Sequence, residues 1–202
     1  MTVSEKTKNK KKMETIISLP NYEVTRVSIP IVNLTPLIMH KWSQKAITEI
    51  EGKHKQVAKT AKGKRDFEAE FEATIYYDSD GDLCFPSIAF KKAMVRACSL
   101  TDGIPMTVAR IAFFVCDEYV KLIKTTKPEM RVDPVRNSNG GADIRARAQI
   151  NKWEANLSVE FNTAKVSADQ IYNLVNIAGM AVGIGEWRPE KTGNTFGRFV
   201  LI

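Results

Sequence analysis

Lysine and arginine are the chemically informative residues of this sequence, since they outnumber the acidic residues and leave a formal net charge of +7 at neutral pH. Each basic side chain that meets a phosphate releases counterions condensed on a nucleic acid, so this balance favours polyanion binding. The 202 residues contain only two histidines and three cysteines, which leaves few candidates for catalysis or metal binding. The composition therefore favours a partner such as RNA, DNA or an anionic surface.

The two histidines, His40 and His54, lack the neighbours that a metal site needs. No cysteine or second histidine lies at ligand spacing from either of them, so we expect no metal and no cofactor. His40 stands beside Lys41, a pair that could supply a general base and charge stabilisation for RNA cleavage. A lone histidine beside Trp42 is also a common structural or base-stacking residue. We therefore expect no catalytic residue and keep His40 as the alternative.

Cys84, Cys98 and Cys116 are an odd set without paired metal spacing, which indicates free thiols in a reducing, cytoplasmic compartment. The Lys-rich start is not followed by the apolar run of a signal peptide, and no stretch has membrane-spanning length. The acidic string 78–82 resembles a calcium loop, but strand-like sequence flanks it and no bidentate glutamate follows. We expect a hairpin turn there.

Basic residues are concentrated between residues 34 and 65, and an acidic stretch, 66–82, follows at once. Large apolar residues are sparse after Ile50, so the basic segment is expected to form an exposed helix or loop inserted between strands, where binding residues often lie. The Lys-rich residues 1–20 are a second basic stretch and indicate either a solvated tail or a nucleic-acid-grasping arm. The basic residues of the inserted segment are Lys41, Lys45, Lys53, Lys55, Lys59, Lys62, Lys64 and Arg65.

Hydrophobic periodicity and turn residues predict alternating strands and helices along the rest of the chain. Ser87 or the residue before it could cap a helix that buries Ile88 and turns Lys91, Lys92 and Arg96 outward. The expected elements are a strand over 22–33, a hairpin of 73–77 with 83–85, helices over 87–98 and 105–112, strands over 113–124, 144–150 and 153–161, a helix capped by Ser167, and a strand over 196–202.

A glycine-rich segment, 183–199, connects the last helix to the last strand. Glycines without Cβ atoms let backbone amides approach a phosphate or a neighbouring strand closely. The order is helix, glycines, strand, the reverse of a dinucleotide-binding fingerprint. Trp187 could stack on a base while Arg188 and Lys191 pair with phosphates, or Trp187 could pack as a lid over the last helix.

Two segments in the right order make the chain resemble the RAMP superfamily of CRISPR effector proteins. The glycines at 183, 185, 193 and 197 are similar to the glycine-rich loop of that family, although the second pair is spaced more widely. Residues 84–93, Cys-Phe-Pro-Ser-Ile-Ala-Phe-Lys-Lys-Ala, are similar to its strand-to-helix passage, without the intervening glycine. The resemblance covers residue 22 onward and is nearest to the backbone subunit that binds guide RNA and to small phage-encoded relatives.

The resemblance implies an α+β, modified ferredoxin-like (RRM-like) antiparallel sheet with helices on one face. We expect a basic tail over 1–20 and one RAMP-like domain over 21–202, with a basic lobe inserted around 34–65. It further implies a protein that polymerises head to tail, as a filament or within a larger complex, without a membrane.

We therefore expect a non-catalytic protein that binds single-stranded RNA or DNA by its backbone, mostly independently of sequence. The alternatives are an RNA endonuclease that uses His40 and a protein-interaction or assembly factor on the same fold. The residues expected to bind are Lys41, Trp42, Lys45, Lys53, Lys55, Arg65, Lys91, Lys92, Arg96, Arg145, Arg147, Gly183, Gly185, Trp187, Arg188 and Lys191.

Overall fold

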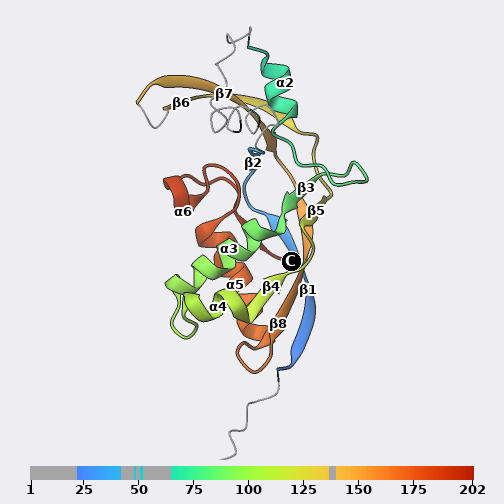
Figure 1. The fold of residues 1–202 in the computed structure, drawn as a ribbon, viewed down its shortest axis with the longest axis vertical. Coiled ribbons are helices and arrows are strands. Elements are labelled where there is room, and N and C mark those ends of the chain that lie inside the picture. Colours follow the sequence, from blue (N-terminus) through green and yellow to red (C-terminus); the bar gives the residue numbers. More distant parts are fainter. Residues whose placement is uncertain (1–21, 42–47, 49–50, 52–64, 137–139) are drawn as a thin grey trace, which may run out of the picture.

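The computed structural model describes residues 22–41, 48, 51, 65–136 and 140–202, in which strands and helices form one body below a smaller lobe (Figure 1). The strands are β1 (Val24–Asn33), β2 (Leu37–Met39), β3 (Cys84–Pro86), β4 (Phe113–Val115), β5 (Tyr119–Ile123), β6 (Glu129–Arg136), β7 (Ala142–Ile150), β8 (Glu154–Asn162) and β9 (Phe199–Leu201). The helical elements are α2 (Phe67–Glu72), α3 (Ser87–Ala97), the 3₁₀ turn η1 (Cys98–Leu100), α4 (Met106–Ala112), α5 (Ala168–Ile177), the π-helical turn η2 (Ala178–Val182) and α6 (Pro189–Thr192).

The larger sheet has the strand order β3-β5-β8-β1-β9, and β4 also pairs with β8. Every pairing in it is antiparallel. In the sequence, α3 lies between β1 and the strands β4 and β5, and α5 lies between β8 and β9. Strands β4 and β5 both pair with β8 and together take the place of one ferredoxin-like strand. Because the first and third strands of this β-α-β-β-α-β order are neighbours at the centre, the arrangement is ferredoxin-like. The predicted α+β fold class is confirmed.

Helices α3, α4 and α5 cover one face of this sheet (Figure 1). The alternation in β8 places Ala155, Leu157, Val159 and Phe161 in the core, as the sequence predicted. Helix α5 begins with a complete capping box, in which Ser167 and Gln170 exchange side-chain to backbone hydrogen bonds. The buried residues of α5 and η2 are Ile171, Leu174, Val175, Ala178, Gly179 and Val182.

A second sheet, with the order β2-β7-β6, forms the smaller lobe. Strands β6 and β7 are a long hairpin, and β2 pairs with the other edge of β7. Helix α2 packs on this hairpin (Figure 1) and begins at Asp66, whose carboxylate accepts hydrogen bonds from the backbone amides of Glu68 and Ala69. The sequence analysis predicted only β7 of this lobe and missed β2, β6 and α2.

Several local predictions need correction. The strand expected over 113–124 is two strands, since Asp117 has a positive φ of 63° and turns the chain between β4 and β5. Ser87 is the first residue of α3 and does not cap it; its hydroxyl donates to the backbone carbonyls of Asp117 and Glu118. Ile88, expected in the core, is 51% exposed. The expected hairpin around 78–82 is a turn closed by one isolated bridge, between Tyr77 and Leu83.

Within the part of the chain that the structure describes, no helix is long and apolar enough to cross a membrane. The tail over 1–20 and nearly all of the basic segment after Lys41 lie outside the described residues. The expected inserted lobe is therefore untested beyond β2.

Candidate nucleic-acid interface

A cleft of about 450 Å³ opens between α3 and the glycine-rich segment. Its lining combines an apolar floor with basic, acidic and aromatic side chains from segments far apart in the sequence. The residues that line it are His40, Tyr76, Phe85, Pro86, Ile88, Ala89, Lys92, Ala93, Arg96, Val182, Gly183, Ile184, Gly185, Glu186, Arg188 and Glu190.

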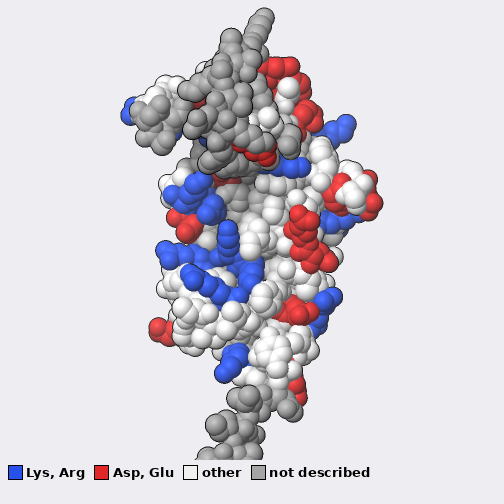
Figure 2. All heavy atoms as spheres, in the orientation of Figure 1, with Lys and Arg blue, Asp and Glu red and all other residues white. Residues whose placement is uncertain are grey.

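Helix α3 supplies one wall of the cleft. Ile88, Ala89, Lys92, Ala93 and Arg96 recur at the spacing of successive turns and therefore share one helix face. The small side chains of Ala89 and Ala93 leave space in the middle of this wall. The longer Lys92 and Arg96 side chains are exposed. Figure 2 shows Lys and Arg gathered over α3 and α6, whereas Asp and Glu gather over α2. The wall is thus an apolar strip with a positive edge.

The glycine-rich segment supplies the opposite wall. Arg188 is fixed by its own loop, because its Nη1 donates to the Gly185 carbonyl at 3.1 Å. Its Nη2 lies 3.1 Å from the Glu190 carboxylate, which is also 3.7 Å from Nε of Arg96 on α3. Pro189 is the first residue of the short helix α6, a position where its missing N–H costs nothing. Glu190 therefore spans the two walls.

The glycines of this segment allow close packing of the chain against itself. A Cβ atom on Gly197 would lie 1.8 Å from the Ile184 carbonyl oxygen, and one on Gly185 would lie 2.6 Å from the Ile38 carbonyl oxygen. The amides of Ile184, Glu186 and Gly197 donate to backbone carbonyls of Gly197, Ile38 and Pro36. Of the two explanations that the sequence left open, close approach to a neighbouring strand is the one observed here.

Glu186 lines the cleft and is held there by two basic side chains. Its carboxylate lies 3.7 Å from Nδ1 of His40, an ion-pair distance, and 3.2 Å from the Lys191 ammonium. Contact with His40 and the charge of Lys191 lower the pKa of Glu186 to about 2, although partial burial opposes that shift. The cleft thus contains a carboxylate that stays ionised at any physiological pH.

Trp187 packs on the β6–β7 hairpin, and its ring centroid lies 5.0 Å from the Arg131 guanidinium and 5.3 Å from that of Arg147. Arg131 and Arg147 are cross-strand neighbours, so both guanidinium groups rise from one sheet face. Phe196 completes the cluster, 6.0 Å from the Trp187 ring. Trp187 is therefore a lid, as one interpretation expected, but over the arginines of the second sheet and not over the last helix.

Arg147 does not present its charge to solvent, because it is 3% exposed. Burial lowers its pKa, and its Nε and Nη1 atoms lack hydrogen-bond partners among the described residues. The phosphate contact predicted for Arg147 does not fit this position. Arg145, Arg147 and Gln149 alternate along β7 and therefore share one sheet face. Arg145 on this face lies 3.7 Å from the Asp143 carboxylate, and the charges of Glu186 and Asp133 favour the protonated form of Arg147.

The other predicted binding residues separate into three groups. The cleft brings together Lys92, Arg96, Gly183, Gly185 and Arg188, and His40 also lines it. Other basic residues contact side chains elsewhere: Lys91 lies over the Phe114 ring, Lys41 over Tyr76, Arg65 pairs with Glu70 and Asp143, and Lys191 pairs with Glu186. Trp42, Lys45, Lys53 and Lys55 lie outside the described residues.

Sequence analysis missed Tyr76, Glu186 and Glu190 as cleft residues. Tyr76 was assigned to a hairpin strand, and only the tertiary structure brings it to the cleft that His40 also lines. Glu186 and Glu190 flank Arg188 within the glycine-rich segment, so their proximity to it was visible in the sequence. An acidic residue beside an expected phosphate ligand was the available signal.

The face of the larger sheet opposite the helices is a poor second candidate. The outward positions of β1 and β8, all of which the structure describes, carry no aromatic residue for base stacking, unlike an RRM. Basic side chains there are paired, Arg26 with Glu160 at 3.0 Å and Lys124 with Glu154 at 2.7 Å. Because these pairs neutralise basic charge on the open face, the cleft is the better candidate site.

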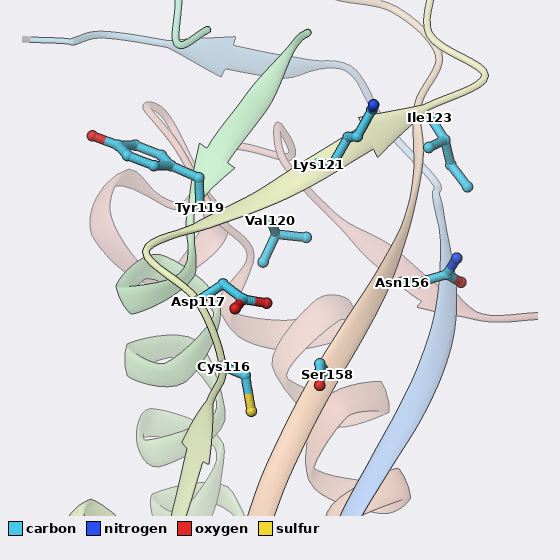
Figure 3. A pocket seen from close by; sticks show the side chains of 8 residues that line it. All are labelled: Cys116, Asp117, Tyr119, Val120, Lys121, Ile123, Asn156 and Ser158. Atoms are coloured by element: carbon cyan, nitrogen blue, oxygen red, sulfur yellow. The ribbon is translucent and has the colours of Figure 1, made fainter. Parts of the chain in front are cut away.

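A smaller hollow of about 280 Å³ interrupts the open face where β4 and β5 diverge from β8. Strand β4 pairs with β8 at residues 113–115 and β5 rejoins it at 122–123, so the connection between them leaves a gap. Figure 3 shows Cys116, Asp117 and Ser158 around this gap and Tyr119 pointing away from it.

The other two cysteines, Cys84 and Cys98, are buried elsewhere, and burial raises the pKa of Cys84 to about 11.

Comparisons with known proteins give a likeness of fold only. No protein-family model and no curated protein matches the chain. Among solved structures it is similar to the crystal structure of Cmr6 from Pyrococcus furiosus, at 10% sequence identity and a TM-score of 0.47, over 89% of this chain and 99% of that one. The assignment of the cleft rests on this chain's own residues.

Proposed function

We propose that this protein binds single-stranded nucleic acid without cleaving it, in the cleft between α3 and the glycine-rich segment. The observation that carries the proposal is the meeting of Lys92, Arg96 and Arg188 from two distant segments along the rim of one cleft. Basic groups on a rim bind successive phosphates, and their number sets the salt dependence of affinity.

The floor of the cleft favours a single strand over a duplex. Phe85, Val182 and Ile184 give the cleft an apolar surface between its basic side chains. Ile88 adds to this surface from the α3 wall, and Tyr76 adds an aromatic ring. An unstacked base gains from such a floor while its phosphates remain at the rim, whereas a duplex keeps its bases stacked. Since every base has an apolar face, we expect little dependence on sequence.

Fluorescence anisotropy with labelled single-stranded RNA, single-stranded DNA and duplex, over a salt series, tests this function. We expect strongly salt-dependent binding to the single strands and at least about fivefold weaker binding by Arg188→Ala, with a smaller salt slope. Arg26→Ala on the open sheet face is the matched control and should bind within about twofold of wild type. Equal losses in both variants, or no binding by wild type, would contradict the proposal, and the latter would favour a protein-interaction role.

We further propose that the chain is a RAMP-like protein that assembles head to tail along the strand. The ferredoxin-like strand order and the two sequence segments that resemble the family support this. The acidic Glu68 and Glu72 on α2 and the basic side chains over α3 and α6 lie at separate places on the molecule (Figure 2). Opposite charges so placed suit a heterologous contact between copies.

An RNA endonuclease is the second candidate, because His40, Glu186 and Tyr76 line the same cleft. The pairing of His40 with Glu186 at 3.7 Å could orient its imidazole toward a bound ribose hydroxyl. Incubation of labelled RNA with wild type and His40→Ala in the presence of a chelator decides between the two. The binding proposal expects intact RNA with both proteins, whereas cleavage by wild type alone would establish the nuclease.

A further inference from the structure

Glu190 is the acidic residue that bridges the two walls of the proposed binding cleft. Its carboxylate lies 3.1 Å from Nη2 of Arg188 on the glycine-rich segment and 3.7 Å from Nε of Arg96 on α3. All three side chains line the cleft. One anionic group therefore neutralises two of the cations that the proposed function assigns to phosphate.

We propose that Glu190 is an internal competitor, which occupies in the free protein the position that a phosphate takes in the complex. The inference rests on the proposed function. A carboxylate and a phosphodiester both carry one negative charge and both accept charge-assisted hydrogen bonds from guanidinium groups. Binding then exchanges one anion for another on Arg96 and Arg188.

The geometry makes this exchange inexpensive. Glu190 and Arg188 side chains are both 32% exposed, and ion pairs that water reaches are weak because solvent screens them. Arg188 keeps its orientation after Glu190 leaves, because its Nη1 donates to the Gly185 carbonyl and that bond does not involve Glu190. The arginine is thus preorganised for the incoming phosphate.

Glu186, the other acidic residue of the cleft, has a different position. It is 23% exposed and is held by both His40 and Lys191, whereas Glu190 is the carboxylate that pairs with Arg96. Its ionisation is stabilised by these contacts. Glu190 on the four-residue helix α6 is accordingly the carboxylate that a ligand can displace.

Competition of this kind sets a threshold for binding. A lone phosphate must displace Glu190 without further gain, whereas a strand also reaches Lys92 and the apolar floor of the same cleft. Glu190 thereby favours polyanions over small anions, at the cost of affinity for both.

The test is Glu190→Gln, which keeps the shape of the side chain and removes its charge. With a labelled oligouridylate at low salt, we expect Glu190→Gln to bind about fivefold to thirtyfold more tightly than wild type, since both the competing pair and the repulsion of the phosphate are removed. Glu160→Gln is the matched control: it frees Arg26 on the open face by the same change of charge and should change affinity by less than about twofold.

If Glu190 only held α6 against α3 and did not compete with a phosphate, the experiment would give the opposite result. Glu190→Gln would then lower the melting temperature and bind the oligouridylate no better than wild type, which would overturn the inference. If Arg188→Ala still weakened binding in that case, the proposed function would stand without it. If Arg188→Ala bound as wild type does, the cleft would not be the binding surface, and both would fail. The double variant Arg96→Ala with Glu190→Gln should lose much of the gain, because one of the freed cations is gone.

Discussion

Glu186, His40 and Lys191 show how single residues of this cleft determine one another's chemistry. The imidazole and the ammonium lie on either side of one carboxylate, whose pKa falls to about 2. Trp187 next to it has a positive φ of 54°, an unusual backbone conformation for a tryptophan. Its contacts with Arg131 and Arg147 hold it there. Electrostatic contacts thus hold Glu186 in position, and aromatic contacts hold the adjacent Trp187.

Replacing Glu186 by Gln should make stability less dependent on pH in the acid range. The folded pKa of about 2 lies below the ordinary 4.5, so this carboxylate stabilises the fold above about pH 4.5 and loses that effect as the pH falls toward 2. At neutral pH we expect Glu186→Gln to lose on the order of 2 kcal/mol of unfolding free energy. Urea titrations between pH 7 and 3 measure this. A difference from wild type that did not shrink at low pH would contradict the assigned cause.

The glycine-rich segment is the element that joins the two sheets. Gly185 approaches the β2 backbone at Ile38. Gly197, near the end of the segment, packs against the backbone of Ile184 near its start. These approaches place Arg188 and Glu190 opposite α3. In α3 the alternation of large and small residues leaves room for the cleft between them.

Gly197→Ala and Gly193→Ala separate crowding from backbone strain in this segment. The two glycines have nearly equal φ values, 68° and 70°, but a Cβ would meet the Ile184 carbonyl only at Gly197, and nothing within 4 Å at Gly193. We expect Gly193→Ala to cost about 1 kcal/mol of stability and Gly197→Ala about 1–3 kcal/mol more. Thermal and denaturant unfolding of the pair gives the answer, and equal losses would argue against the tight crossing.

At the scale of the whole molecule, the two faces of the larger sheet differ in what covers them and in their side chains. The helices and the glycine-rich segment on one side carry the cleft, while the opposite face has paired charges and no aromatic residue at the outward positions of β1 and β8. The smaller lobe stands beyond the cleft with the acidic α2 on it (Figures 1 and 2). If the cleft binds nucleic acid as proposed, the bound single strand is expected to pass between the smaller lobe and the helices.

Assembly along the strand should be visible as growth in mass. Light scattering with single strands of increasing length is expected to show one further copy for each added increment, if copies contact one another head to tail. Arg188→Ala should require more protein to reach the same mass. One copy per strand at every length would leave binding intact and remove the filament.

Local patterns in the sequence predicted the alternating strands and helices of the core, and the family resemblance added their ferredoxin-like arrangement. Alternation in β8 and the capping of α5 by Ser167 depend on residues two or three positions apart, which is why the sequence predicted them. Helix α2 was missed because its acidic residues suggested only a charge boundary, and β2 because three residues are too few for a periodic signal.

Only the tertiary structure decided which basic residues share a site. Arg96 and Arg188 meet across the cleft, and Arg147 is withdrawn beneath Trp187, because the glycine-rich segment crosses itself at Gly197 and rests on β2 at Gly185. Those contacts join residues far apart along the chain, and no local pattern specifies them. Charge is a property of the sequence, whereas the exposure of each charge and its partner are properties of the packing.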